Sequence, residues 1–267
     1  MILLNVLILV AIAAAAVTVM IASEDIEVRR TIRLKDAAQA QALSRAGELS
    51  AVVALRRDAL QAPSADAYDE PWAAIAQKPT AVPQGRFALA ISDEQARFNI
   101  NSLVRDDAIA ASRFRRIALE AGLTETSFAA VAALVRTAGP LKDDTMLSVL
   151  GLTSAEIAGL GRMIAYLPPE ARLNLNTVDP DLLSVLLDDP STVKGFLALR
   201  DAKGQISQAD LDRFGLNGVG GLTSSHFSLT TTVSVGNATL VTLSRIERFA
   251  TPQGAQAVVT ARRRLPP

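Results

Sequence analysis

The sequence predicts an α+β protein in which a long N-terminal helix, membrane-spanning in its first half, packs on a small antiparallel sheet that carries a large all-α insertion. Three observations predict this fold class. The chain opens with an uncharged apolar stretch that runs directly into helix-forming residues. It closes with three β-branched runs. Between these ends lie short aliphatic segments separated by glycine and proline.

Residues 1–22 form the apolar stretch, in which Asn5 and Thr18 are the only polar residues. As a helix it would be about 33 Å long at ~1.5 Å per residue, enough to cross a hydrocarbon core of ~30 Å. A cleaved secretory signal is the alternative, because Ala13 to Ala16 supply the small residues that a signal peptidase accepts. The first charge is Glu24, however, and the apolar run exceeds the roughly 7–15 residues of a signal core. These features favour a retained transmembrane helix.

Residues 23–61 are expected to continue the same helix as a stalk outside the membrane, since they contain no proline and one glycine, Gly47. A narrow apolar stripe recurs along this stalk at helical spacing, formed by Ala42, Ala46, Leu49 and Val53. The stripe predicts packing either onto the globular part of the chain or onto a neighbouring rod.

Residues 62–100 are predicted to hold a connection and then the first hairpin of the sheet. Prolines recur up to Pro83 and exclude a long helix, while Trp72, the only tryptophan, is expected to fix the connection to the body by burying its ring. In residues 85–100, apolar positions alternate on both sides of a short polar segment. This pattern predicts a β-hairpin whose second arm ends in a helix N-cap at Asn101 and Ser102.

Residues 101–222 read as several short helices broken at glycines and prolines, with no sheet signal of any length. They are predicted to form a helical domain of the SAM-like or helix-hairpin-helix-like kind. Residues 223–267 then supply three strands, joined through Gly236-Asn237 and through residues 251–254. The helical domain therefore leaves and re-enters one sheet.

An internal repeat marks two corners of the insertion. The segment FNINSL at 98–103 is matched by LNLNTV at 173–178, and each leads into an aliphatic segment. We expect one asparagine of each copy to bond to the backbone and the final Asn-Ser or Asn-Thr to cap the next helix. No base or nucleophile accompanies either copy, which favours a structural role over catalysis. The predicted corner residues are Asn99, Asn101, Ser102, Asn174, Asn176 and Thr177.

The composition argues against most catalytic and nucleic-acid chemistry. Lysines and arginines number 27 and so do aspartates and glutamates, so no basic excess indicates nucleic acid. The chain has no cysteine and a single histidine, His226, which argues against a zinc site or a Ser-His-Asp triad. A polar residue near the start of a strand is the expected role of His226. No catalytic residue and no cofactor is predicted.

Calcium is the one metal for which the sequence offers candidates. Asp143 and Asp144 lie beside the Gly139-Pro140 turn, and a carboxylate pair near a loop can contribute to a Ca²⁺ site. Calcium takes about six to eight oxygens, and the segment lacks the alternating Asp/Asn/Gly ladder of a dedicated loop. The pair is therefore a candidate only, and no calcium loop is predicted.

Residues 173–210 resemble the repeats of helix-hairpin-helix DNA-binding modules. Such modules bind phosphate through the backbone amides of a glycine-rich hairpin, and the matching position here holds Asp188, Asp189 and Pro190. Two carboxylates repel a phosphate and the proline removes a donor. The architecture is expected to be shared without nucleic-acid binding. A membrane-anchored DNA-binding protein of an uptake system is the alternative function.

An apolar N-terminal helix that continues as a stalk and meets a small antiparallel sheet resembles the plan of type IV pilins and pseudopilins. ARFNINSL at 96–103, LNLNTV at 173–178 and the helical insertion narrow the resemblance to the GspK family, the large minor pseudopilins of type II secretion. The resemblance implies a pilin-like fold, with a single pass through the bacterial inner membrane and the bulk of the chain in the periplasm. It also implies a place at the tip of the pseudopilus, in its assembly and in the export of folded proteins.

The same resemblance implies partners and assembly residues. The partners would be the minor pseudopilins of the I and J types, the major pseudopilin and the inner-membrane secretion platform. Most pilin-like subunits carry a glutamate at position five that pairs with the N-terminal amine of the subunit above, whereas this chain has Asn5, as suits a subunit with nothing above it. Met1 would be either the mature, methylated first residue or a start placed too late. The acidic, tyrosine-containing calcium segment of the family is replaced by the short stretch 134–140, which argues against bound calcium.

Overall fold

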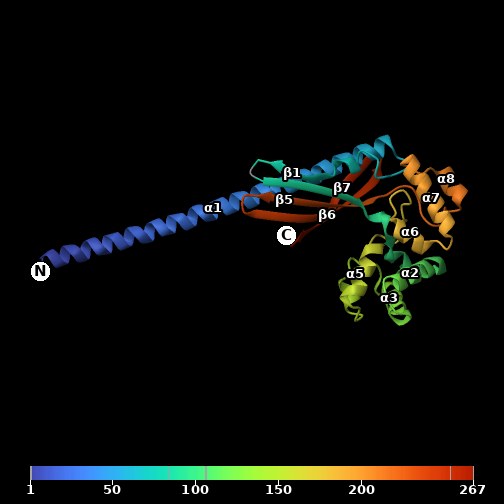
Figure 1. Ribbon diagram of the computed structural model, residues 1–267, viewed down its shortest axis with the longest axis horizontal. Coiled ribbons are helices and arrows are strands. Elements are labelled where there is room, and N and C mark those ends of the chain that lie inside the picture. Colours follow the sequence, from blue (N-terminus) through green and yellow to red (C-terminus); the bar gives the residue numbers. More distant parts are fainter. Residues whose placement is uncertain (1, 84, 106, 253, 267) are drawn as a thin grey trace.

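The computed structural model describes residues 2–83, 85–105, 107–252 and 254–266. Its dominant element is helix α1, Ile2–Gln61, an unbroken rod of 60 residues. The first half projects away from the body of the molecule and the second half lies along it (Figure 1). The buried residues of α1 begin at Asp36. The long N-terminal helix predicted from the sequence is therefore present as one element.

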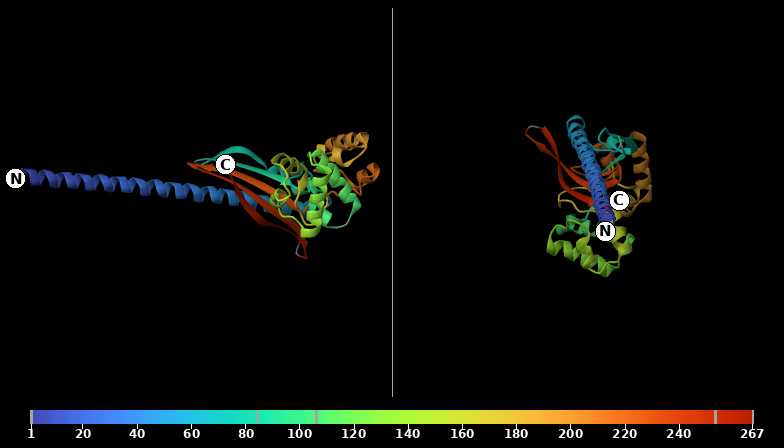
Figure 2. Two further views of the ribbon diagram at one scale, coloured as in Figure 1. Left: turned by 90° about the horizontal axis from the view of Figure 1, so that it is seen from below. Right: turned by 90° about the vertical axis from the view of Figure 1, so that its left-hand side faces the viewer.

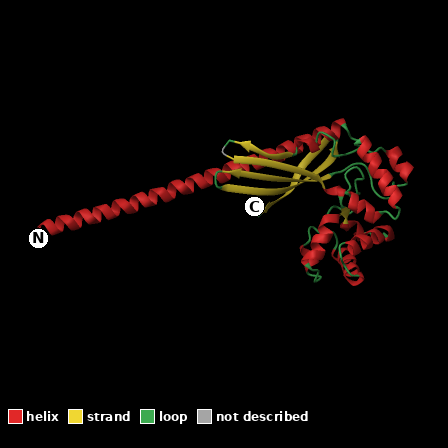
Figure 3. Cartoon of the chain, in the orientation of Figure 1, coloured by secondary structure: helices red, strands yellow, loops and turns green. Residues whose placement is uncertain are grey.

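Five strands form a single antiparallel sheet in the order β1-β2-β5-β6-β7. The strands are β1 (Gln77–Val82), β2 (Gly85–Asp93), β5 (His226–Val235), β6 (Ala238–Thr251) and β7 (Gly254–Leu265). The three C-terminal strands are confirmed, and His226 begins the first of them. Helix α1 lies across one face of this sheet (Figure 3) and contacts four of the strands, β2, β5, β6 and β7.

The packing of α1 on the sheet combines close approach with buried polar bonds. Gly47 has no side chain, and a Cβ there would lie 3.1 Å from side-chain atoms of Phe87, Leu89 and Thr231. One turn away, the Ser44 and Thr231 hydroxyls lie 2.7 Å apart and share a hydrogen bond. The glycine therefore lets the helix settle deep enough for its short polar side chains to reach the strands.

The second polar contact of α1 involves a buried charge. Glu48 accepts a hydrogen bond from Ser244 at 2.5 Å and from the Arg262 guanidinium at 2.8 Å. Glu48 is 4% exposed, and burial without those partners would be costly. The side chains of β6 and β7 thus hold α1 at one position along the sheet.

The hairpin predicted over residues 85–100 is wrong. Strand β2 pairs instead with β1, which precedes it, and with β5, which follows the insertion. Strand β1 was hidden in the predicted connection because it is an edge strand, exposed along most of its length and irregular around Pro79, so it has no apolar alternation. Phe98 and Asn99 form the two-residue strand β3, which pairs in parallel with β4 (Ile164–Ala165) inside the insertion.

The apolar stripe of the stalk does not face the globular part, so the first of its two predicted roles is wrong. Its four residues are all exposed, Leu49 to 64% and Val53 to 45%. The face turned toward the sheet is instead mixed in polarity, and it is formed by Asp36, Ala40, Ser44, Gly47, Glu48, Ala51, Leu55 and Asp58. The second half of α1 therefore carries an exposed apolar stripe on the side that does not pack on the sheet.

The insertion is helical, as predicted, and lies at the end of the body that is far from the N-terminus (Figure 2). Its helices are α2 (Ala108–Glu120), α3 (Glu125–Ala138), α4 (Thr145–Ser148), α5 (Ser154–Met163), α6 (Pro180–Leu186), α7 (Pro190–Lys203) and α8 (Gln208–Phe214), with short 3-10 turns η2 (Glu94–Ala96) and η3 (Ile100–Val104) at its entry. Phe114 is fully buried at its centre, between Phe98 and Phe128. This aliphatic and aromatic core is separate from the core under α1.

Trp72 fixes the connection after α1 to the body, as expected from the sequence. Its ring is fully buried and meets Phe227 of β5 edge-on, with ring centroids 5.1 Å apart. Its indole Nε1 donates to Glu70 at 3.1 Å. The short 3-10 turn η1 (Ala73–Ile75) follows and leads into β1.

Replacing Gly47 with leucine should separate α1 from the sheet. We expect the Gly47→Leu variant to lose about 1–3 kcal/mol of unfolding free energy through overpacking, in spite of the better helix propensity of leucine. Urea unfolding of the full chain in detergent micelles measures this loss. The matched control is Ala46→Leu, on the exposed side of the same turn, which should stay within about 0.5 kcal/mol of the wild type. Equal losses in the two variants would contradict the close packing at Gly47.

Candidate functional site: the apolar anchor and the buried junction

The first half of α1 is the most exposed apolar surface of the described chain. Its side chains between Ile2 and Ile21 are exposed on every side of the helix. The helix is long and apolar enough to cross a membrane, with a mean hydropathy of 2.8 in its most apolar window. Asn5 lies exposed in this stretch, and Met1 lies outside the described residues. The surface needs lipid or other helices to cover it.

A second candidate region is the junction where α1, the sheet and the insertion meet. Asp93 ends strand β2 and is 2% exposed. Its Oδ2 atom accepts hydrogen bonds from Thr177 at 2.5 Å, from Ser224 at 2.6 Å and from Asn174 at 2.9 Å. Its Oδ1 atom accepts from the backbone N–H of Gln95 at 2.8 Å. One carboxylate therefore joins the entry and the exit of the insertion.

Burial is the main influence on the charge of Asp93. Removal from water raises the pKa of Asp93 from 3.8 to about 6, against the opposing effect of its hydrogen bonds to Ser224, Thr177, Gln95 and Asn174. At neutral pH the group is still a carboxylate, because four donors stabilise the charged form. Because the folded and unfolded chains bind the Asp93 proton with different pKa values, the unfolding free energy depends on pH.

The two asparagine corners repeat the same hydrogen bonds. In each copy the first asparagine accepts through Oδ1 from the backbone N–H two residues ahead, Asn99 from Asn101 at 3.1 Å and Asn174 from Asn176 at 3.0 Å. The second asparagine then accepts through Oδ1 from a distant backbone N–H. Asn101 accepts from Leu141 at 2.7 Å, and Asn176 accepts from Ile206 at 2.7 Å. The repeat in the sequence therefore corresponds to a repeated set of hydrogen bonds, one within the corner and one to a distant segment.

The amide groups of the corners bind backbone carbonyls of other segments. Asn101 donates to Leu141 and Leu167, and Asn99 donates to Pro168 and Ala171. Asn174 is fully buried and donates to three acceptors, the Asp66 carbonyl, Asp93 and Ser224, each at 2.9 Å. Ser102 and Thr177 turn their hydroxyls back to the carbonyls of Asn99 and Asn174.

The corners do not cap the following α-helices as the sequence analysis expected. Helix α2 begins at Ala108, four residues after the end of η3, and is capped by Asp107, while α6 is capped by Asp179. The asparagine at the start of η3, Asn99, caps only that 3-10 turn. The four corner asparagines are buried and bond to distant segments, whereas the capping aspartates are exposed.

Loss of Asn174 should weaken the junction. The Asn174→Ala variant leaves the Asp66 carbonyl and Asp93 with fewer donors in a buried place, at a cost of about 1–3 kcal/mol for each group that becomes unsatisfied. Thermal and urea unfolding of the full chain measure the effect. Asn217→Ala, an exposed asparagine of the same insertion, should cost less than about 1 kcal/mol. A neutral Asn174→Ala variant would contradict the role of this corner.

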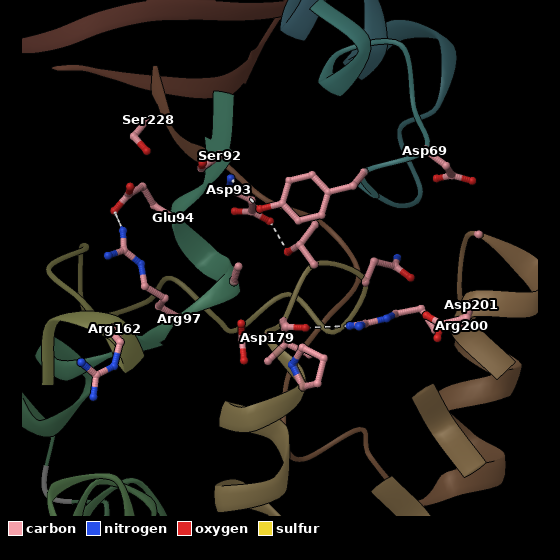
Figure 4. A pocket seen from close by; sticks show the side chains of 17 residues that line it. Asp69, Ser92, Asp93, Glu94, Arg97, Arg162, Asp179, Arg200, Asp201 and Ser228 are labelled. Atoms are coloured by element: carbon pink, nitrogen blue, oxygen red, sulfur yellow. Dashed lines mark hydrogen bonds and ion pairs between the residues drawn. The ribbon is translucent and has the colours of Figure 1, made fainter. Parts of the chain in front are cut away.

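Between the insertion and the sheet lies a cleft of about 650 Å³ (Figure 4). Charges of both signs line it, and several are already paired. Arg97 bonds to Glu94, and Arg200 donates to the Val178 carbonyl at 2.7 Å. The mixed charge and the existing bonds give this cleft no preference for one ligand.

The aspartate pair predicted as a calcium candidate does not belong to a larger group of carboxylates among the described residues. Asp143 accepts from the backbone N–H and the hydroxyl of Thr145, and these bonds lower the pKa of Asp143. Asp144 precedes the single-turn helix α4 and makes no side-chain capping bond. Asp143 is therefore bonded within its own turn.

A carboxylate cluster that was not predicted from the sequence lies at the C-terminal end of α1. One oxygen each of Asp58, Asp66 and Glu70 lies within 4.8 Å of the others. Arg248 of β6 bonds to Asp58 at 3.0 Å and to Asp66 at 2.5 Å. Asp58 lies on the helix and Asp66 on the loop after it, so no short motif joins them. The only indication in the sequence is the number of acidic residues between 58 and 70.

The position that DNA-binding hairpins use for phosphate is occupied by a side chain. Asp189 caps α7 and accepts from the backbone N–H groups of Ser191 at 3.0 Å and Thr192 at 3.2 Å. These bonds and those to the two hydroxyls lower the pKa of Asp189 to about 2. The amides that would meet a phosphate are therefore satisfied by a carboxylate.

None of the protein-family models compared with the chain matches it. A curated relative, the type II secretion system protein K of Pseudomonas aeruginosa, is 24% identical over an alignment of 292 positions that covers 92% of this chain and 87% of the relative. The chain is therefore similar to a type II secretion system protein K along nearly its whole length.

The fold is also similar to that of a solved secretion protein. A chain in the crystal structure of the GspK-GspI-GspJ complex from the type 2 secretion system of enterotoxigenic Escherichia coli superposes with a TM-score of 0.68 at 21% identity. The match covers 89% of this chain and all of that chain. The pilin-like arrangement of a long helix, an antiparallel sheet and a helical insertion, expected from the sequence, is confirmed.

The raised pKa of Asp93 predicts a pH-dependent stability. In the unfolded chain Asp93 titrates near 3.8 and in the folded chain at about 6, so between these values the folded state binds more protons. The stabilisation of the folded state by protonated Asp93 is therefore present in full below about pH 4. It is lost as the pH rises through 6, by about 3 kcal/mol in total. The expected outcome is a wild-type unfolding free energy that falls across this window relative to that of Asp93→Asn.

Urea unfolding of the full chain in detergent micelles at a series of pH values measures this difference. Asp201→Asn, exposed at the rim of the same cleft, is the control and should follow the wild type. Parallel pH profiles for the wild type and Asp93→Asn would contradict the prediction.

Proposed function

We propose that this chain assembles with minor pseudopilins of the I and J types at the tip of a type II secretion pseudopilus, in the assembly of that filament and the export of folded proteins. The observation that carries the proposal is the likeness of the whole fold to a chain of the GspK-GspI-GspJ complex. The major pseudopilin below the tip and the secretion platform of the inner membrane are the further partners.

The shape of the chain supports a place at the end of a filament. The apolar rod leaves the body on one side, and the insertion adds its bulk at the opposite end (Figure 1). Subunits that pack by their rods would therefore place this bulk beyond the rods, where it covers the end of the assembly. On this proposal residues 101–222 are the capping domain, inserted into a sheet formed by residues 62–100 and 223–267.

The first half of α1 supports a membrane location before assembly. On this proposal residues 1–22 span the inner membrane once and residues 23–61 form a stalk that holds the body in the periplasm. Met1 and Asn5 are the assembly residues. A carboxylate at position five is costly in lipid unless a cation pairs with it, and a subunit with no neighbour above it has no such cation to meet, which suits Asn5.

The exposed stripe of the stalk supplies the contact that this function requires. Ala42, Ala46, Leu49 and Val53 face away from the sheet of their own chain. Their small and aliphatic side chains suit a second helix packed at close distance. We therefore expect the stripe to meet the rod of a partner subunit.

Site-specific cross-linking tests this contact directly, because the chain contains no cysteine and each introduced thiol is unique. The full chain is co-expressed with pseudopilins of the I and J types, and a photoreactive group is attached to the thiol of the Leu49→Cys variant. We expect co-purification of the three proteins and cross-links from position 49 to a partner.

The matched control is Ala129→Cys, exposed on α3 of the insertion, which should give no comparable cross-link. Failure of the three proteins to co-purify would contradict the proposed partners. Co-purification with cross-links from position 129 and none from position 49 would contradict the proposed use of the stripe. Salt-dependent binding of the chain to duplex DNA would favour the alternative function in DNA uptake.

A further inference from the structure

A basic groove of about 500 Å³ lies between α1 and the strands β6 and β7. The charged side chains that line it are Arg45 and Glu48 of α1 with Arg262 and Arg264 of β7. Arg45 precedes Glu48 by three residues and so lies on the same side of the helix. Three guanidiniums share the groove with one carboxylate, which leaves two positive charges in excess.

The register of the sheet brings the strand residues of the groove together. Across β6 and β7, Thr242 pairs with Arg264 and Ser244 pairs with Arg262. Ser244 and Arg262 both bond to Glu48, so this side of the two strands faces α1. The helix and two strands therefore supply hydrogen-bond donors to one groove.

Most of these donors are unused within the part of the chain that the structure describes. The Nε atom of Arg262 donates to the two oxygens of Glu48 at 2.8 and 2.9 Å, while its Nη1 and Nη2 atoms bond to no described residue. Arg45 and Arg264 form no hydrogen bond or ion pair with any described residue. Thr242 is only 7% exposed, and its hydroxyl also bonds to no described residue. A largely buried hydroxyl has lost most of its contact with water, so it favours an acceptor inside the groove.

This set of donors selects an oxyanion. The planar guanidinium of arginine presents paired N–H groups that match two oxygens of a carboxylate or a phosphate. Glu48 already compensates one of the three arginines, through its bonds to Arg262. Two arginines and one hydroxyl thus remain for an anion from outside the chain.

The lipids of the membrane that holds α1 lie too far away to supply this anion. Arg45 follows Ile21 by 24 residues of unbroken helix, which is about 36 Å at ~1.5 Å per residue. The polar headgroup region extends only about 5–8 Å beyond the hydrocarbon core on each side. The anion must therefore come from solution or from a partner protein.

The groove adjoins the apolar stripe of the stalk. Arg45 lies three residues after Ala42 and four residues before Leu49, and residues at these separations are neighbours on the surface of a helix. A partner rod that covers the stripe therefore has one flank beside Arg45. Acidic side chains on that flank would be directed to the opening of the groove.

We propose that the basic groove receives carboxylate side chains from the partner rod that packs on the stripe. The inference rests on the proposed function and adds the chemistry of the contact, an apolar line with aspartate or glutamate beside it. The apolar line supplies buried area. The ion pairs fix the register of the two rods and disfavour a rod that lacks the acidic residues.

Reversing the two unused charges tests the proposal in the full chain, co-expressed with pseudopilins of the I and J types and purified in detergent micelles. The Arg45→Glu/Arg264→Glu variant should recover the partners more than about tenfold less well than the wild type, because attraction becomes repulsion. Neither arginine has a partner among the described residues, so the midpoint of urea unfolding should match that of the wild type. Arg45→Gln/Arg264→Gln removes the charges without adding new ones and serves if the first variant does not fold.

Two further measurements assign the effect to the groove. Arg136→Glu/Lys194→Glu, at exposed positions of the insertion, makes the same change in net charge and should recover the partners as the wild type does. A photoreactive group attached to Gln41→Cys, which lines the groove, should cross-link to a partner segment that contains aspartate or glutamate, as mass spectrometry of the product would show.

The outcomes separate this inference from the proposed function. If the wild type and the Arg45→Glu/Arg264→Glu variant recover the partners equally well, the proposed function stands and the groove has no part in it. Stabilisation of the wild-type chain alone by inorganic phosphate, together with that equal recovery, would assign the groove to a free anion. Failure of the wild type itself to recover the partners would contradict both the proposed function and this inference.

Discussion

The structure depends on how a long, mostly alanine-rich rod is fixed at one position on a sheet. Apolar contacts alone would let such a helix slide or rotate, because small side chains fit one another at many positions. The buried face of α1 is half polar, and its polar members bond to specific partners, Ser44 to Thr231, Glu48 to Ser244 and Asp58 to Arg248. A displaced helix would leave buried polar groups without partners, at a cost of about 1–3 kcal/mol each. These bonds therefore select one register, and Gly47 allows the approach that makes them possible.

The insertion is attached by the same kind of interaction. Its two ends lie together because Asp93 of β2 pairs with Phe227 of β5, so the chain leaves and returns at neighbouring strands. A two-point attachment on its own permits a domain to swing. Asn174, Thr177 and Ser224 all bond to the Asp93 carboxylate, which ties the second corner of the insertion to the strand from which the insertion departs. A helical domain is thereby joined to the sheet through a buried polar network rather than through a shared apolar core.

The sequence predicted the parts of this fold whose signals are local. The apolar start, the unbroken helix to Gln61 and the three β-branched strands each depend on residues close together in the chain. Strand β1 escaped prediction because an exposed edge strand with a proline has no apolar alternation to detect. The second arm of the predicted hairpin failed for the opposite reason, since Phe98 and Ile100 alternate properly but are buried in the insertion. Local pattern shows that a residue is buried, but not against which core.

In the candidate site, too, the sequence predicted the residues of local motifs but not their distant partners. The repeated asparagines were visible in the sequence as corner residues, yet their partners, such as Leu141 for Asn101 and Ile206 for Asn176, lie 40 and 30 residues away. A short-range capping role was the natural expectation and was wrong for the helices α2 and α6. The cluster around Arg248 could not be predicted, because Asp58 and Arg248 are separated by 190 residues and meet only when α1 takes its register.

The two halves of α1 differ in how many neighbours they can accept. Between Ile2 and Ile21 the helix is apolar on every side and touches no other part of its chain, so lipid or several helices can surround it. From Asp36 to the C-terminal end of α1, one side of the helix is covered by the sheet. Leu49 lies about 200° around the helix from the buried Ala51. This half therefore has a single apolar line left for a partner. A subunit built in this way can be buried among others at its apolar end while its body stays at the periphery, with contact to a neighbouring rod along one line only.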